Sequence, residues 1–373
     1  MTDNTASILF CGDFAPIATK PEIGIFNEFK KIIKTSDLSY LNLESPLGQG
    51  TYPIKKNGLN LSLDHNWIRV IEGGGFSLIG LANNHIMDQG AEALIATISQ
   101  IERFQLNHIG AGINLFEAQK PQLLSVNGLR IALIAIAEHE FSIASNNIPG
   151  VAPLDEIDNF YQIRNALTIS DHVIIVLHAG NEYFPLPRPG LRKICRFFID
   201  LGASSVICHH NHIPSAYEIY KDSFISYGLG NLFFTPMKNT EKWDSGYSVK
   251  LIFQKNKKMN FKLYYHSFGA NNINVEKDKN HVRDFVETKN DILSNPEEYK
   301  VHWSNYIRQK EYGMLYTAFF PFTFRKSEFL FRFLKLDKLT IPKKSILRKI
   351  NVINCESHLE LLREILNKRE ERS

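Results

Sequence analysis

Residues 76–90, FSLIGLANNHIMDQG, join an apolar run to an abrupt cluster of polar side chains. The run FSLIGLA (76–82) predicts a buried strand, and EALIATISQIERF (92–104), opened by Gly90, predicts a helix behind it. In an open α/β sheet, the functional site lies beyond the carboxyl ends of the strands. The polar side chains at this position are Asn83, Asn84, His85 and Asp88. The stretch therefore predicts an α/β fold with a site where this strand ends.

Short apolar runs alternate with helical patterns up to about residue 235, which predicts βα units and a largely parallel sheet. The dipeptide Asn127-Gly128 favours a tight turn, so a hairpin is expected over 123–137. The alternating runs 247–254 and 259–266 predict a late antiparallel pair. Further strands are predicted at 7–11, 38–43, 171–178, 204–208, 215–220 and 223–229, and further helices at 22–36 and 189–202.

The predicted strand ends carry polar side chains of one chemical kind. Carboxylate, amide and imidazole groups are ligands that suit Zn, Mn or Fe. One such residue is weak support, because Asp13 could cap a helix and Asn84 could be a turn residue. Six strand ends with the same ligand chemistry predict a metal site much more strongly. These ends carry Asp13, Glu44, Asn84, His178 with Glu182, His210 with His212, and Asn231.

The spacing of His210 and His212 adds to this prediction. In an extended segment, side chains two residues apart point to the same side, so both imidazoles can face one metal centre. A lone histidine, such as His65 or His108, is more often a surface or core residue. We therefore assign the His210–His212 pair, and not the lone histidines, to metal binding.

Composition narrows the class of protein. The chain has 373 residues with 44% hydrophobic and 22% charged residues, which is typical of a soluble globular protein. A formal charge of +4 is small for this length, so no nucleic-acid partner is expected. No apolar stretch approaches the roughly 20 residues of a membrane helix, and the N-terminus is a poor signal peptide. The four cysteines form no CxxC pair, so a cytoplasmic location is expected.

The sequence changes character beyond about residue 275. Residues 321–373 contain 13 Lys and Arg against 7 Asp and Glu, and aromatic residues lie between the basic ones. This basic segment could contact an anionic membrane surface, but such aromatics more often pack on the main domain while the charges stay solvated. Residues 356–373 predict a final amphipathic helix. Its expected apolar face consists of Leu359, Leu362, Ile365 and Leu366.

Seven spaced motifs carry a resemblance to a known family. They are CGDFA, LNLESPLG, GLANNHIMDQG, GAGINLFEAQKP, LHAGNEYFP, CHHNHIPSAYEIY and SYGLGNLFF. In this order, over about residues 7–235, they resemble the CapA family of capsule or poly-γ-glutamate biosynthesis proteins, which is related to the calcineurin-like metallophosphoesterases. The resemblance implies a metallophosphoesterase-like αββα sandwich, in which two β-sheets pack between helices. We therefore expect such a domain over residues 1–275 and a mostly helical, basic extension over residues 276–373.

The resemblance also implies one or two divalent metal ions and a ligand set. Related phosphoesterases usually have Asp-x-His in the first motif, whereas this chain has Asp13-Phe14-Ala15, so one ligand is missing or is replaced by Glu44 or Glu182. Cys208, Asn211 and Ser215 also depart from the family pattern, which puts substrate contacts from that loop in doubt. The implied metal ligands are Asp13, Glu44 near the bridging position, Asn84, His178, His210 and His212.

The implied chemistry is hydrolysis by metal-bound hydroxide, because a divalent ion lowers the pKa of bound water toward about 7. His85 is expected to be the acid beside the leaving group, oriented by Asp88. Asn83, Glu182 and Asn231 are candidates for substrate binding, although Asn83 could instead only shape the turn. Glu182 could also bind metal or act as a base.

Three function classes stay open at this point. The first is hydrolysis of a phosphoester or of an intermediate of surface-polymer assembly. The second is a non-catalytic accessory subunit of a polyglutamate or polysaccharide synthesis complex. The third is amide or peptide hydrolysis or transfer on an acidic polymer, because the same chemistry attacks carbonyl groups. The link to a polymer rests on the resemblance alone.

Overall fold

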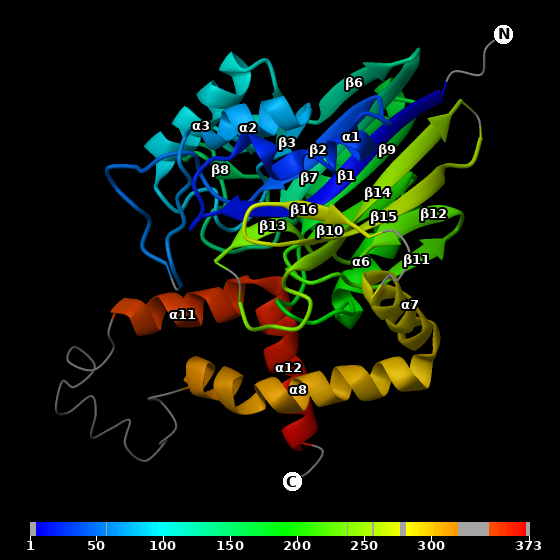
Figure 1. The fold of residues 1–373 in the computed structure, drawn as a ribbon. Coiled ribbons are helices and arrows are strands. Elements are labelled where there is room, and N and C mark those ends of the chain that lie inside the picture. Colours follow the sequence, from blue (N-terminus) through cyan, green and yellow to red (C-terminus); the bar gives the residue numbers. More distant parts are fainter. Residues whose placement is uncertain are drawn as a thin grey trace.

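A computed structural model describes residues 5–56, 58–236, 238–255, 257–276, 281–319 and 343–370. Two twisted sheets lie against each other, helices cover their outer faces, and a separate group of helices lies across one end (Figure 1). The N-terminus lies at the opposite end of the sheets from this helical group.

The first sheet has the strand order β16-β15-β14-β1-β2-β3-β4, with β13 also paired to β1. Strands β1 to β4 are mutually parallel, whereas β14, β15 and β16 are antiparallel additions, which confirms the predicted late pair. The strands are β1 (Thr5–Pro16), β2 (Leu38–Leu43), β3 (Leu78–Gly80), β4 (Asn107–Ile109), β13 (Asn231–Thr235), β14 (Ser245–Gln254), β15 (Asn260–Phe268) and β16 (Ile273–Val275).

The second sheet has the order β11-β12-β10-β9-β7-β6. Its edge hairpin confirms the Asn-Gly prediction, because Asn127 and Gly128 both have positive φ, 50° and 81°. The strands are β6 (Gln122–Val126), β7 (Leu129–Ala137), β9 (His172–His178), β10 (Ser205–His209), β11 (Tyr217–Tyr220) and β12 (Ser223–Ser226). A small pair, β5 (Ala111–Gly112) and β8 (Gly150–Val151), lies apart from both sheets.

Successive side chains of a buried strand point to opposite faces of the sheet and enter two different hydrophobic clusters. In β7, Ile131 and Leu133 belong to the cluster that contains the first sheet, whereas Ala132 and Ile134 belong to the cluster beneath the helices. The helices over this second sheet are α5 (Glu156–Ile169) and α6 (Pro189–Asp200), and those over the first sheet are α2 (Trp67–Gly74) and α3 (Ala91–Arg103). The αββα sandwich is therefore confirmed, since a strand with two apolar faces needs a partner on each side.

Several predicted boundaries were wrong, and two elements differ most from the prediction. The strand predicted at 7–11 continues as β1 to Pro16, because β13 pairs with it from Asp13 onward after a register shift. The helix predicted over 22–36 is only a short 3₁₀ turn (Ile23–Phe26) followed by α1 (Lys30–Ile33). Local bonds such as Asn27 N–H to the Gly24 carbonyl replace the longer α-helical ones. The apolar side chains of this segment still enter the core, except for the exposed Ile23.

The C-terminal helices are α7 (His281–Ser294), α8 (Pro296–Phe319), α11 (Lys343–Asn354) and α12 (Glu356–Glu370). Trp303, Ile307, Leu361 and Ile365 are buried in the same cluster as the apolar face of α6. The predicted apolar face of α12 was partly wrong, because Leu361 is buried and Leu366 is 40% exposed. The aromatic and basic run at 321–335, to which the membrane-contact prediction applied, lies outside the described residues.

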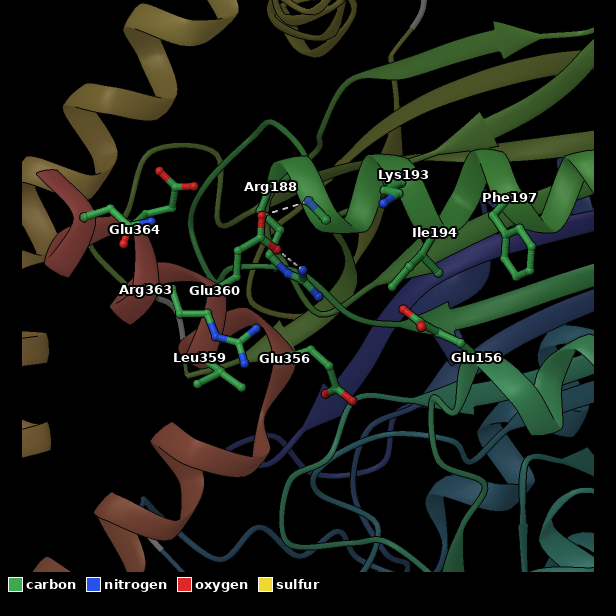
Figure 2. A pocket seen from close by; sticks show the side chains of 12 residues that line it. Glu156, Arg188, Lys193, Ile194, Phe197, Glu356, Leu359, Glu360, Arg363 and Glu364 are labelled. Atoms are coloured by element: carbon green, nitrogen blue, oxygen red, sulfur yellow. Dashed lines mark hydrogen bonds and ion pairs between the residues drawn. The ribbon is translucent and has the colours of Figure 1, made fainter.

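Ion pairs tie α12 to the sandwich (Figure 2). Arg188, just before α6, contacts both Glu360 of α12 and Glu138, which directly follows β7. The Gly190 amide also donates to Glu360 (2.8 Å). Beside this contact lies a hollow of about 630 Å³ between α6 and α12 that contains none of the predicted site residues. Among the helices of the described ranges, none is long and apolar enough to cross a bilayer.

Candidate metal centre

Acidic and imidazole side chains from both sheets meet where the strands end toward the C-terminal helices. Two groups have ligand atoms that all lie within 4.8 Å of one another, and Glu44 belongs to both. The first group is Glu44, His178 and His210, and the second is Asp13, Glu44 and His212. The structure therefore brings five of the six predicted ligands into two adjoining sites, with Glu44 in the shared position.

Glu44 is the residue that fits a metal best. Its side chain is fully buried, and neither carboxylate oxygen has a hydrogen-bond partner among the described residues. Its Oε1 lies 3.7 Å from Nε2 of His178 and 3.7 Å from Nε2 of His212. Burial, followed by the charge of Asp13, raises the pKa of Glu44 well above its ordinary value. A buried carboxylate without a partner is costly, and a divalent ion between these groups would remove that cost.

His178 and His210 present their ring nitrogens to the same space. His210 Nδ1 lies 3.1 Å from His178 Nε2, and Asn84 Oδ1 lies 3.1 Å from the same Nε2. Burial and the neighbouring His210 lower the pKa of His178 well below its ordinary value. The neutral imidazole is the form that binds metal ions, so the environment of His178 favours coordination. Asn84, the sixth predicted ligand, thus lies against the first group.

Asp13 is held in place by neighbours that sequence reasoning missed. Asn42 Nδ2 and His209 Nδ1 both donate to Oδ1 of Asp13, at 2.7 and 2.9 Å. Burial alone would raise the pKa of Asp13, but the hydrogen bond and charge of His209 hold it below its usual range. Gly12 permits this position, because a Cβ there would lie 2.0 Å from the Gly230 carbonyl oxygen. Asp13 is therefore an ionised carboxylate, and the hydrogen bonds to its Oδ1 fix the orientation of the whole group.

The geometric reason given for the His210–His212 pair was wrong. Both residues have a left-handed backbone, with φ of 90° and 60°, rather than an extended one. They consequently enter different groups, His210 with His178 and His212 with Asp13. Such backbone conformations are strained for residues with a Cβ and concentrate at functional sites. Burial lowers the pKa of His212 to about 4, which again keeps an imidazole neutral.

His85 lies at the edge of the centre, and its ring contacts Asp88 as predicted. Nδ1 of His85 donates to Asp88 Oδ2 (2.7 Å), and Lys56 Nζ lies 3.0 Å from the same Nδ1. Lys56 also forms a buried ion pair with Asp88, a partner that sequence reasoning missed. Because Nδ1 is engaged on this side, Nε2 is the atom that can exchange a proton with a bound molecule.

The three predicted substrate-binding residues have different surroundings. Asn83 donates to the Leu43 carbonyl (2.9 Å) and accepts from the His85 amide (3.1 Å), so its contacts lie within the turn. Asn231 holds Nδ1 of His212 at 3.1 Å, which orients that ring. Glu182 belongs to neither ligand group and lines the cleft above them. Although burial opposes it, the charges of His212 and His210 lower the pKa of Glu182 to about 2.

The metal centre opens into a cleft of about 510 Å³. Glu140, another residue that sequence reasoning missed, lines it and lies 3.7 Å from His210 Nε2. Signals for the missed neighbours were present, because Asn42 lies in β2 two positions before Glu44, and His209 adjoins His210 in CHHNH. Spacing alone does not say which of several adjacent polar residues faces the site.

Comparisons with known proteins add a family. A family described as bacterial capsule synthesis protein PGA_cap matches residues 7–236. The PGA biosynthesis protein CapA of Bacillus subtilis is 30% identical over 214 residues, which cover 56% of either chain. The capsule biosynthesis protein CapA of Bacillus anthracis is 28% identical over 219 residues, which cover 56% of this chain and 53% of that one. The chain thus spans about half the length of the curated relatives it matches.

Similarity to solved structures is looser. A phosphatase from Mycoplasma pneumoniae superimposes with a TM-score of 0.47 at 15% identity, over 74% of this chain and 96% of that one. At this level the similarity transfers neither a site nor an activity.

Proposed function

Since this chain belongs to the PGA_cap family of bacterial capsule synthesis proteins, we propose that it is a metal-dependent hydrolase of a phosphoester or of a surface-polymer intermediate. The single observation that carries the proposal is Glu44, a fully buried carboxylate with two unpartnered oxygens between two sets of ligands. A structural ion pair would place a cation there instead. A shared carboxylate flanked by neutral imidazoles is the arrangement of a one- or two-metal centre.

The first ion would be held by Glu44, His178 and His210, with Asn84 beside them, and the second by Asp13, Glu44 and His212. Mn, Fe or Zn would suit this mixture of oxygen and nitrogen ligands. When bound, such ions supply an activated water and polarise the scissile group. His209 and Asn42 fix Asp13, and Asn231 fixes His212, so the ligands are aligned before any substrate arrives.

His85 would act as the proton donor to the leaving group through Nε2, while Asp88 accepts from Nδ1 and is itself paired with Lys56. This role needs no direct contact between His85 and a metal ion. Glu182 and Glu140 line the cleft on the substrate side of the ligands and would bind or exclude parts of the substrate. Asn83 would act through the turn, because its side chain holds the Leu43 carbonyl and the His85 amide.

Two other classes remain as alternatives. An accessory subunit of a capsule or polyglutamate synthesis complex would use the cleft only for binding. An amide hydrolase or transferase would use the same centre on an acidic polymer. The neutral imidazoles and the His85–Asp88 pair favour catalysis over binding alone, because binding does not need an oriented proton donor.

The test is metal analysis of the purified protein, followed by a panel of phosphoesters and γ-glutamyl amides. At least one Mn, Fe or Zn per chain and turnover of a phosphoester are expected. The double change His210→Ala with His212→Ala should abolish both. A wild-type protein that carries no metal and takes none up would contradict the hydrolase and favour the accessory role. Turnover of the amides alone would identify the third class.

A further inference from the structure

The C-terminal helices form one wall of the cleft above the metal centre. Tyr306, Lys310 and Met314 of α8 line the cleft together with residues of α11 and α12. The cleft is also lined by Leu59 and Leu61 of the segment after β2. All the helical residues lie outside the range 7–236 that the family match covers. The cleft therefore combines residues inside the range of the family match with helical residues outside it.

Tyr306 fixes α8 on the loop that follows β9. Its ring stacks on Phe184 with centroids 4.2 Å apart, and Trp303 packs on both rings. Burial raises the pKa of Tyr306, and the charge of Glu182 raises it further. An aromatic stack of this kind positions the helix firmly relative to the ligands.

Two lysines that line this cleft, Lys238 and Lys310, each lie above an aromatic ring. Lys310 Nζ lies 5.4 Å from the centroid of the Tyr306 ring. Lys238 Nζ lies 4.5 Å from the Trp243 ring and donates to the Tyr183 hydroxyl (2.6 Å). The rings of Tyr183 and Trp243 in turn pack against the candidate ligand His212. Within the described ranges, neither ammonium group has a carboxylate oxygen at ion-pair distance.

We propose that Lys238 and Lys310 form an anion-binding pair, which holds a second negatively charged group of the substrate while its scissile group lies at the metal centre. The assignment of a scissile group rests on the proposed hydrolase function. An ammonium group above an aromatic ring keeps N–H donors free for an anion, and it accepts carboxylate and phosphate alike.

The test measures binding, which needs no turnover. The probes are hexa-γ-glutamate, a glycerol phosphate oligomer, and a neutral glutamine oligomer of equal length, titrated by calorimetry against metal-loaded protein. The variants are Lys238→Gln, Lys310→Gln and the double variant that carries both changes. Each is compared with Lys300→Gln, a matched control at an exposed position of α8, the helix that carries Lys310. Melting curves verify that each variant is folded. No loss of stability is expected, because all three lysines are exposed.

Each single change should weaken binding of an anionic probe about two- to five-fold, and the double change about ten-fold. The double variant should also show a weaker salt dependence, while Lys300→Gln and the neutral probe should show less than a two-fold change. Preference for the glutamate or the phosphate oligomer identifies the anionic group. If Lys238→Gln and Lys310→Gln match the Lys300→Gln control, or if the neutral probe loses affinity equally, the proposal is overturned.

Failure of the inference and failure of the hydrolase function are separable. Lysine-dependent binding without turnover of any substrate would keep the anion-binding pair and reject the hydrolase. Turnover of a singly charged phosphoester, with no binding of either oligomer, would keep the hydrolase and reject the pair.

Discussion

The metal-centre end of the sandwich and the helices that face it use polar side chains in opposite ways. In the sandwich, Asp13, Glu44 and His178 turn toward one another around a shared space. In the helices, Glu356 and Glu360 reach across to pair with residues of the sandwich. The first arrangement concentrates charge at a cost that a ligand must offset, and the second neutralises charge to hold two parts together. Substitutions on the two sides should therefore affect different measurements.

The largest effect is expected for Glu44→Gln. Removing the carboxylate that both ligand groups share should eliminate bound metal and reduce hydrolysis by about 10³-fold or more. The metal-free variant should melt no lower than metal-free wild type, because a buried unpartnered charge has been removed. Metal analysis and thermal melting check both points. Glu182→Gln, in the same cleft but in neither ligand group, is the control and should retain its metal.

If Glu44→Gln keeps full metal content, metal binding does not depend on the shared carboxylate. The proposal that the charges in this region are held together by a bound ligand is then contradicted.

The next effect is expected on the helical side, for Arg188→Met. This change leaves Glu138 buried without its partner and frees Glu360 of α12, so the free energy of unfolding should fall by about 3–5 kcal/mol. Urea denaturation measures the loss, and metal content should stay unchanged. Adding Glu138→Gln should recover part of it. Lys193→Met, which lines the same hollow, should change stability by less than about 0.5 kcal/mol.

If Arg188→Met loses metal without losing stability, the helical side does not act mainly through stability, and the contrast between the two regions is contradicted.

A smaller and more selective effect is expected for His85→Asn. Metal content should persist, whereas hydrolysis of an alkyl phosphoester should slow by about 10²-fold and that of an activated aryl phosphoester much less. Steady-state kinetics on the two substrates provide the measurement. Asp88→Asn is a poorer probe of the same role, because it also leaves Lys56 buried without its partner. Equal slowing of both substrates together with loss of metal would make His85 a ligand.

The smallest effect is a pH dependence of helix docking. A hydrogen bond from His139 to Glu356 of α12 raises the pKa of His139, although partial burial opposes it. A raised pKa in the folded state stabilises the protein at pH below the ordinary histidine value, and this stabilisation is lost as pH rises through the raised value. Glu356→Gln should therefore lower the melting temperature slightly near pH 6 and hardly at all near pH 8.5. An equal decrease at both pH values would argue against the ion pair.

Sequence patterns predicted the layers and most ligands because both depend on local rules. Alternation in β7 and the polar residues after β9 and β10 follow directly from strand geometry. The short turn at 22–36 did not follow, because apolar spacing is satisfied equally by a helix and by tighter turns that bury the same faces.

Residues that support the site were harder to predict than the ligands themselves. His209 binds Asp13 across 196 positions of sequence, and Lys56 reaches Asp88 from a segment without a regular pattern. The left-handed backbone at His210 and His212 also has no signature in residue type, because glycine or asparagine would be expected there. Long-range pairing and local strain are set by the completed fold.

The position of β1 sets the order in which the chain can fold during synthesis. One edge of β1 pairs with β2, but the other edge pairs with β13 and β14, which are made more than 200 residues later. At about 5–20 residues per second, that edge stays open for roughly 10–50 s on the ribosome. An uncovered strand edge of this kind is a template for pairing between nascent chains. Chaperone protection of this edge should therefore matter most for the yield of native protein in a slowly translating host, where the edge stays open longest.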